Sequence, residues 1–232
     1  MQTPITHDRL LPRLKPGLTL LETPSARDTA LHAVVVEALV DATGEALWID
    51  ARNNASTYVL NGVAATDRTL DALRIARAFT AYQHYTLVTE AVRRAGPATA
   101  LVVVPCVAAL YRDDDLPDYR RSQLFESALA LLSELATALS IPVLVTDPGS
   151  AADPASSDEL GALVETHVDH VIACEETAFG YRFETDEFQT TVYWGDGVWQ
   201  TTIPYWVELL GAVDAYERAD VGVETLHPYV VA

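Results

Sequence analysis

Lysine is almost absent from this sequence. Only Lys15 is a lysine among the 15 basic residues, and these face 33 acidic ones, so the 232-residue chain carries a formal net charge of −18. Non-specific binding to nucleic acid needs a basic face, which this composition disfavours. An acidic, lysine-poor surface is typical of a protein adapted to a cytosol rich in salt, where ions screen the repulsion between carboxylates. A GC-rich genome favouring Ala, Val, Arg and Asp is the alternative explanation.

Cysteine and long apolar runs are also scarce. The two cysteines, Cys106 and Cys174, lie in apolar runs, which predicts buried, reduced thiols in a cytoplasmic protein and argues against a disulfide framework. Even the apolar run LHAVVVEALVDA contains acids, so no run reaches membrane-spanning length. The N-terminal sequence lacks the apolar core of a signal peptide, so we expect neither secretion nor a membrane partner. With 50% apolar residues, the chain can bury one full core.

Short apolar runs alternate with longer helical patterns, which predicts an α/β fold with a mostly parallel sheet flanked by helices. The expected strands are 18–21, 46–50, 100–105, 143–146 and 167–174. The expected helices are 29–42, 119–139 and a region over 68–94 that is either continuous or broken near Thr80. Aromatic and β-branched residues over 181–203 predict an antiparallel hairpin turning near 195–197, and 147–157 has the composition of a loop.

No repeat or linker divides the chain. We therefore expect an N-terminal extension over 1–16, one core domain over 17–210 and a C-terminal tail over 211–232.

The segment 18–42 has the strand–turn–helix order in which a phosphate-binding loop would lie. Aligned on Thr29, such a loop requires glycine at positions 22 and 27 and lysine at 28, but this chain has Glu22, Arg27 and Asp28. Glycine permits close approach of the backbone to phosphate, and lysine offsets the phosphate charge. Because Glu22 and Asp28 would repel a triphosphate, we do not expect ordinary ATP binding here.

Seven short segments follow one another in an order and spacing that resemble the RecA/RadA recombinase core and its KaiC-like relatives. The resemblance extends over roughly residues 17–205 and implies a three-layer α/β fold with a mostly parallel central sheet. The segments are 17–22, 48–50, 73–79 followed by Gln83 and His84, 101–104, 107–112, 120–124 and 143–146.

The departures from that family fall on its catalytic positions. Pro105 stands where the family has the acid that holds magnesium through water, and Arg52 stands where it has the glutamate that activates water. Asp28 replaces the loop lysine. The resemblance thus implies a scaffold that has lost its ATPase, with no catalytic residue, cofactor or metal. The degenerate nucleotide site consists of Glu22, Thr23, Ser25, Arg27, Asp28, Thr29, Asp50, Arg52 and Pro105.

Asp50 and Arg52, two residues apart at the end of the second strand, suggest an ion pair that closes the empty cleft. A site for another small ligand is the alternative. The pattern His167-Val168-Asp169-His170 invites a metal interpretation, but on one strand the two histidines would point to opposite faces. We therefore expect these histidines to be structural.

Two clusters are candidates for contact with a partner. Arg112, Arg120 and Arg121 flank a loop that faces DNA in the resembled recombinases. The acids among these arginines would repel phosphate, and surface ion pairs with those acids are the plainer alternative. The cluster of Tyr82, Gln83 and His84 suggests either buried helix packing or a surface that faces a partner.

The leading functional hypothesis is a non-hydrolysing RecA/RadA-like protein that acts by binding other proteins as an accessory to recombination and repair. A recombinase or repair factor would be its partner, and DNA contact is disfavoured by the charge. The alternative is a KaiC-like ATPase, or a sensor of a nucleotide or small ligand, in which Arg27 and Arg52 replace the missing lysine. The sequence does not predict the oligomeric state.

Overall fold

The computed structural model describes residues 10–25, 28–40, 42–64, 66–113, 116–148, 159–178, 180–187, 189–195 and 198–201. The chain divides into two units, Met1–Gln200 and Thr201–Ala232, and the description below concerns the first. The domain boundary expected near residue 210 lies outside the described residues. So does most of the loop expected over 147–157, of which only residues 147 and 148 are described. The strands are β1 (Gly17–Glu22), β2 (Glu45–Ala51), β3 (Leu73–Ala78), β4 (Thr99–Val104), β5 (Pro142–Val145), β6 (His170–Thr177), β7 (Gly180–Glu184), β8 (Gln189–Gly195) and β9 (Val198–Thr201). The helices are α1 (Thr29–Val40), α2 (Thr57–Val63), the short 3-10 helix η1 (Asp67–Leu70), α3 (Ala81–Arg94), α4 (Asp118–Leu139) and α6 (Glu159–His167).

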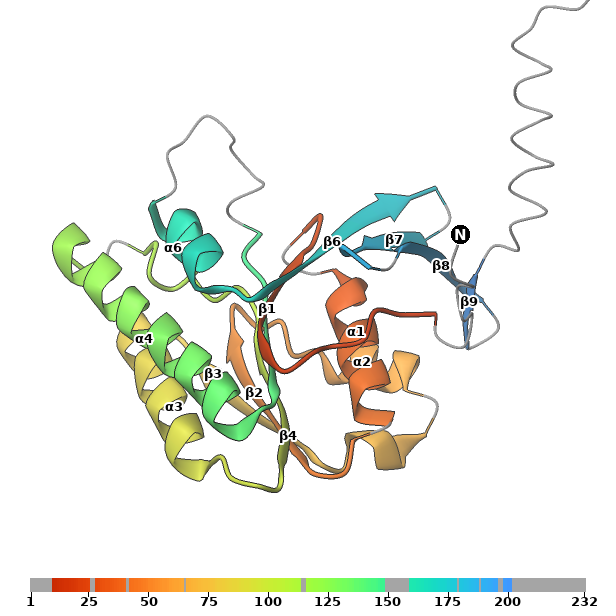
Figure 1. The fold of residues 1–232 in the computed structure, drawn as a ribbon, viewed down its shortest axis with the longest axis horizontal. Helices are drawn as coiled ribbons and strands as arrows, with labels where there is room; N and C mark the ends of the chain where they lie inside the picture. The colour runs from red at the N-terminus through yellow and green to blue at the C-terminus, as the bar shows by residue number, and fades with distance from the viewer. Residues whose placement is uncertain are drawn as a thin grey trace, which may run out of the picture. The chain divides into compact units, whose positions relative to one another are not determined.

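The described strands form one mixed sheet in the order β3-β2-β4-β5-β1-β6-β7-β8-β9. Strands β1 to β6 are parallel to their neighbours, whereas β6, β7 and β8 pair antiparallel. This arrangement confirms the predicted α/β class, the mostly parallel sheet with flanking helices and the antiparallel C-terminal strands. Figure 1 shows α3, α4 and α6 together on one side of the parallel strands and α1 and α2 on the other.

Each face of the sheet carries its own apolar core. The core under α3 and α4 contains Val88, Phe125 and Leu132. The core under α1, on the opposite face of the sheet, contains Leu31 and Val35. Strand β4 contributes to both faces, because the sequence ALVVV has no polar side chain to turn toward water. A strand apolar on both sides belongs in the middle of a covered parallel sheet, which is where β4 lies.

The prediction of a helix beginning at residue 68 was wrong for its first half. Residues 73–78 form β3, the edge strand, and α3 begins at Ala81. Arginines in the sequence LRIARA suggest the polar face of a helix, but an edge strand tolerates them because one side of it remains in water. Thr80, where a break was considered, is the N-cap of α3, and its hydroxyl accepts a hydrogen bond from the Gln83 N–H.

The region after residue 157 also differs from the prediction. Helix α6 precedes β6, so the strand expected from residue 167 begins only at His170. Over the segment expected as a hairpin, β8 ends and β9 begins on either side of the turn predicted near 195–197, and the additional strand β7 precedes them and pairs antiparallel with β8. The short helix α2 was also not predicted, because only seven residues carry its pattern. Within the described residues, no helix has both the length and the apolar character needed to span a membrane.

Candidate functional site

The carboxyl ends of the parallel strands meet at one edge of the sheet, which is where ligands bind in α/β proteins of this kind. Strand β1 lies between β5 and β6, and the chain leaves it toward the start of α1. Loops from β1, β2 and β4 bring together the described members of the degenerate site. Arg27, another member, lies outside the described residues.

Asp28 occupies the start of α1 as a helix cap. Its buried carboxylate accepts a hydrogen bond from the Ala30 N–H at 2.9 Å. The first N–H groups of a helix are the donors that a bound phosphate would use. Next to it, the Thr29 and Tyr181 hydroxyls lie 2.8 Å apart, and the Thr23 hydroxyl donates to the Ser25 carbonyl at 3.0 Å. The hydroxyls of Thr23 and Thr29 and the carboxylate of Asp28 therefore bond within the protein.

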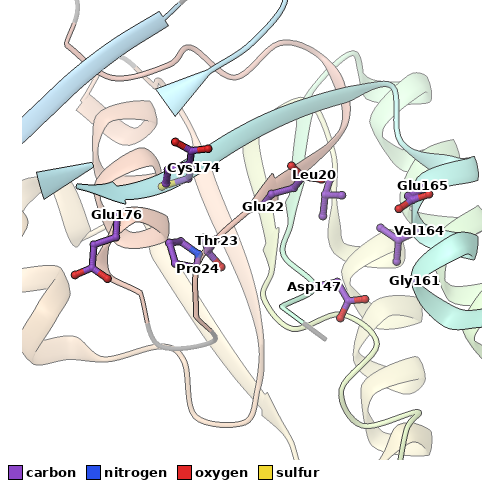
Figure 2. Close-up of a pocket in the computed structure, with 11 residues that line it drawn as sticks. Leu20, Glu22, Thr23, Pro24, Asp147, Gly161, Val164, Glu165, Cys174 and Glu176 are labelled. Atoms are coloured by element: carbon purple, nitrogen blue, oxygen red, sulfur yellow. The ribbon is translucent and has the colours of Figure 1, made fainter. Parts of the chain in front are cut away.

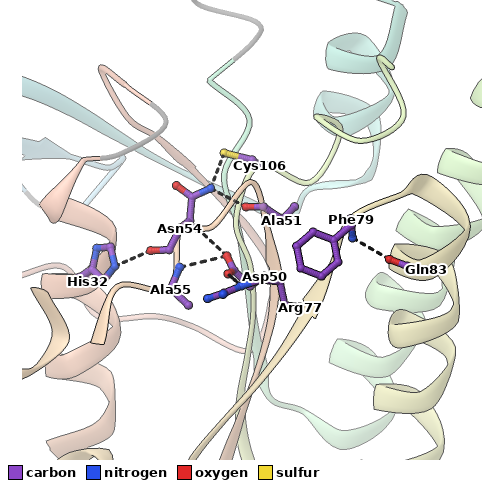
Figure 3. A network of polar contacts seen from close by, with 9 residues as sticks. All are labelled: His32, Asp50, Ala51, Asn54, Ala55, Arg77, Phe79, Gln83 and Cys106. Carbon is purple, nitrogen blue, oxygen red and sulfur yellow. Dashed lines mark hydrogen bonds and ion pairs between the residues drawn. The ribbon is translucent and has the colours of Figure 1, made fainter. Parts of the chain in front are cut away.

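Asp50, at the end of β2, is fully buried and satisfied by three donors. Its Oδ1 accepts the N–H groups of Asn54 (2.7 Å) and Ala55 (3.0 Å), and its Oδ2 pairs with Arg77 Nε at 2.8 Å (Figure 3). Arg77 faces Asp50 because β2 and β3 pair in parallel with these two residues in register. The predicted Asp50–Arg52 ion pair was therefore wrong.

Arg52 turns away from Asp50 because the backbone bends sharply after β2. Its φ is 60°, in the left-handed region, and Asn53 shares that conformation. The guanidinium instead pairs with Asp113 and donates to the Ala109 carbonyl at 3.1 Å. Arg52 thus ties the loop after β2 to the loop after β4.

Asn54, in the loop after β2, contacts helix α1 and the loop after β4 in the interior. Its side-chain Nδ2 donates to the Ala51 carbonyl at 2.7 Å and contacts Cys106 Sγ at 3.3 Å, while its backbone carbonyl accepts from His32 Nε2 at 2.9 Å (Figure 3). A carbonyl can only accept, and Nδ1 of His32 lies farther from its carbonyl, that of Asp28, at 3.4 Å, so the shorter contact assigns the proton of the ring to Nε2. Burial lowers the pKa of His32, which favours the neutral ring.

Pro105 follows directly after β4, where the resembled family has its metal-binding acid. The next residue, Cys106, has a φ of 49°, and its N–H donates to the Thr146 hydroxyl at 2.9 Å. The Val107 N–H donates to the Thr146 carbonyl, also at 2.9 Å. Burial raises the pKa of Cys106, so this thiol is unsuited to act as a nucleophile. These bonds fasten the loop after β4 to the end of β5.

The three candidate arginines separate into different roles. Arg112 forms a two-pronged pair with the buried carboxylate of Asp147, at 2.6 and 2.7 Å. Arg121 donates to the carbonyls of Asp113 and Leu116, each at 3.3 Å. Arg120 is exposed and donates to the Tyr82 hydroxyl at 3.2 Å. Of the three, Arg120 has the geometry of a surface contact residue.

The cluster at the start of α3 divides between the surface and the core. Tyr82 and Gln83 are exposed, as a partner-facing surface requires. His84 is fully buried, with Nδ1 2.9 Å from the Tyr111 hydroxyl and its ring edge-on to the Tyr111 ring. His84 is therefore corrected from a candidate contact to a core residue.

A cavity of about 510 Å³ lies at the carboxyl end of β1 (Figure 2). Leu20, Val164, Pro24 and Cys174 supply apolar lining, and burial raises the pKa of Cys174 to about 12. The carboxylates that line it are those of Glu22, Asp147, Glu165, Glu175 and Glu176, and its described lining contains neither lysine nor arginine. A phosphate group would be repelled by that lining.

The two histidines considered for a metal belong to different elements. His167 ends α6, with Nδ1 2.8 Å from the Leu163 carbonyl, and His170 begins β6, with Nε2 3.2 Å from the Pro16 carbonyl. In the described part of the chain, no three His, Cys, Asp or Glu side chains are grouped to hold a metal ion.

Sequence reasoning missed Arg77, Asn54 and Asp147 as members of this region. Arg77 was missed because its segment was assigned to a helix. A signal was available, since an acid that ends a buried strand needs a partner on the neighbouring strand.

The fold and these contacts define a mixed α/β protein whose strand-end loops are joined by internal polar contacts. No protein-family model matches the chain, and no curated protein matches it either.

Proposed function

We propose that this protein is a RecA/RadA-like scaffold that does not hydrolyse nucleotide and acts by binding other proteins, as an accessory to DNA recombination and repair. The proposal rests first on the resemblance over residues 17–205. Its main structural support is that Asp50, which would serve nucleotide chemistry in that family, is instead bonded to Arg77 and to two backbone N–H groups.

Two further contacts support the loss of nucleotide chemistry. Asp28 caps α1 where a phosphate would receive the helix N–H groups. Pro105 leads into a loop fastened to Thr146, with no carboxylate at the position that would hold a magnesium ion. A nucleotide would have to displace these internal bonds and also meet the carboxylates of the cavity.

Calorimetry with ATP and magnesium in molar KCl tests the first half of the proposal. We expect no binding heat at millimolar ATP, because no described lysine or arginine lines the cavity at the β1 end. Saturable binding accompanied by release of inorganic phosphate would overturn it. The ATPase alternative needs Arg27 and Arg52 in place of lysine, yet Arg52 is already bonded to Asp113 and Ala109.

Affinity purification of the tagged chain from a high-salt lysate tests the second half. We expect a recombinase or repair factor to be enriched over a lysate passed through the same resin without bait. Repeated failure to enrich any such factor would remove the assignment to recombination and repair.

A second candidate function is the binding of a small ligand other than a nucleotide, favoured by the 510 Å³ cavity. Its apolar floor and carboxylate lining suit an organic amine better than an anion. Spermidine at millimolar concentration should then raise the melting temperature, and Glu22→Gln should abolish that rise. Glu126→Gln, an exposed acid on α4 outside the cavity, is the matched control. An unchanged melting temperature would exclude this function for polyamines.

A further inference from the structure

Charge is distributed unevenly along this acidic chain. Residues 72–112 contain five arginines and a single acid, Glu90, so this stretch carries +4 while the other 191 residues carry −22. The stretch includes β3, α3 and β4. Of these, β3 and α3 lie at one edge of the sheet. Because these five arginines pair with Glu45, Asp50, Glu90 and Asp147, that edge is nearer to neutral than the rest of this acidic chain and repels an acidic partner less.

Exposed aromatic side chains gather at the same edge. The large apolar side chains that are exposed in the described structure number seven, and four of them lie on β3 or at the starts of α3 and α4. Three are aromatic: Phe79 is 71% exposed, Tyr82 51% and Tyr119 74%. Aromatic side chains that remain in water cost free energy, and clusters of them are typical of interaction sites.

Contacts between α3 and α4 hold these residues together. Arg120 of α4 donates to the Tyr82 hydroxyl of α3 at 3.2 Å. At the start of α3, the Phe79 N–H donates to Gln83 Oε1 at 2.9 Å, as Figure 3 shows. A depression of about 270 Å³ lies beside this contact, lined by Tyr82, Arg120, Gln123, Leu124 and Ser127. We call Phe79, Tyr82, Tyr119, Arg120 and Gln123 the aromatic–arginine patch.

We propose that the aromatic–arginine patch is the docking surface for an acidic segment of another protein, which deepens and rests on the proposed protein-binding function. An apolar side chain of that segment would occupy the depression beside Tyr82 and Leu124. A carboxylate would pair with Arg120, whose hydrogen bond to a neutral hydroxyl leaves its charge uncancelled by that contact.

The charges favour an acidic protein segment over nucleic acid. Arg74 and Arg94 share Glu45, Arg77 pairs with Asp50, and Arg112 pairs with Asp147. These guanidinium groups are already engaged, whereas a nucleic-acid site needs several cations free to follow successive phosphates. One guanidinium among aromatic side chains matches a protein interface better.

Fluorescence anisotropy on the full chain in molar KCl tests the proposal. The probe is a labelled peptide of about 16 residues, composed equally of Glu, Asp, Phe and Leu. We expect saturable binding that Arg120→Glu weakens at least about tenfold and Tyr82→Ala weakens by a similar factor. A peptide with lysine in place of every acid should not bind.

Matched controls lie elsewhere on the surface. Arg93→Glu reverses an exposed arginine at the other end of α3, and Tyr58→Ala removes an aromatic that is 89% exposed on α2. Both should leave peptide binding within about twofold of the wild-type value. Circular dichroism of each variant checks that the fold is retained.

Four results would overturn the proposal: no binding of the acidic peptide, binding that Arg120→Glu does not change, tighter binding of single-stranded oligo-dT than of the peptide, or patch-dependent self-association by sedimentation velocity. Failure of the patch is distinguishable from failure of the proposed function. Absence of peptide binding together with enrichment of a repair factor in the affinity purification removes the patch alone, whereas release of inorganic phosphate from ATP removes the non-hydrolysing function and leaves the patch intact.

Discussion

Replacing Asp50 tests whether this buried acid stabilises the fold or is retained for a ligand. An acid kept for a ligand usually costs stability, so its removal stabilises the protein. Here the carboxylate is fully buried and bonded to two backbone N–H groups and to Arg77. We therefore expect Asp50→Ala to lower the free energy of unfolding.

The magnitude follows from the groups left without partners. Asp50→Ala leaves two buried N–H groups, those of Asn54 and Ala55, without an acceptor. Each unsatisfied group costs about 1–3 kcal/mol, so we expect the free energy of unfolding to fall by about 4 kcal/mol. Arg77 adds little to that loss, because its side chain is 41% exposed and can turn to water. For a chain of this size about 4 kcal/mol lowers the melting temperature by about 10 °C.

Urea unfolding followed by circular dichroism in molar KCl measures the effect. Arg77→Gln should cost about 2 kcal/mol, since it leaves the buried carboxylate without its cation. The matched control is Arg74→Gln on the same strand, where the partner Glu45 is 27% exposed and the expected loss is under about 1 kcal/mol. An Asp50→Ala variant as stable as wild type, or more stable, would refute the structural role of Asp50.

Three other predictions concern the solvent. Lowering KCl from multimolar to low concentration should reduce the melting temperature, because the net charge of −18 is then unscreened; an unchanged value contradicts the salt adaptation. Burial lowers the pKa of His84 from 6.5 to about 4, so the unfolded chain binds more protons between these values. His84 should therefore contribute about 2 kcal/mol to the loss of stability between pH 7 and pH 5, and the loss should be smaller by about that amount in His84→Gln; an equal loss in the variant would contradict this. Burial also raises the pKa of Cys106 and Cys174, so a thiol-specific disulfide reagent at pH 8 should label neither before unfolding; rapid labelling of the native protein would contradict this.

Strongly periodic or continuously apolar segments were predictable from the sequence. Helix α4 and strand β4 were found within a residue of their bounds because each is packed on the faces that its pattern marks. Strand β3 was not, because an edge strand needs only one protected side and its arginines can then remain in water. Helix α6 was missed because it is short and its apolar residues run directly into β6.

The candidate site was predictable in its location and not in its pairing. Spacing placed Asp28 just before the first helix and Asp50 and Pro105 at strand ends, and all three lie there. The partner of Asp50 depends on the register between β2 and β3, which brings together residues 27 positions apart. The pairing of Arg112 with Asp147 likewise depends on the neighbouring positions of β4 and β5 in the sheet.

By itself the sequence determined the α/β class, the acidic and nearly lysine-free composition, and the absence of glycine and lysine from the phosphate-loop positions, because these follow from local pattern and composition. Only the tertiary structure decided which guanidinium meets which carboxylate, which histidine is buried, and which aromatic side chains remain exposed around Arg120. The physical reason is that side-chain partners are set by strand order, register and helix packing, which join residues that no local pattern connects.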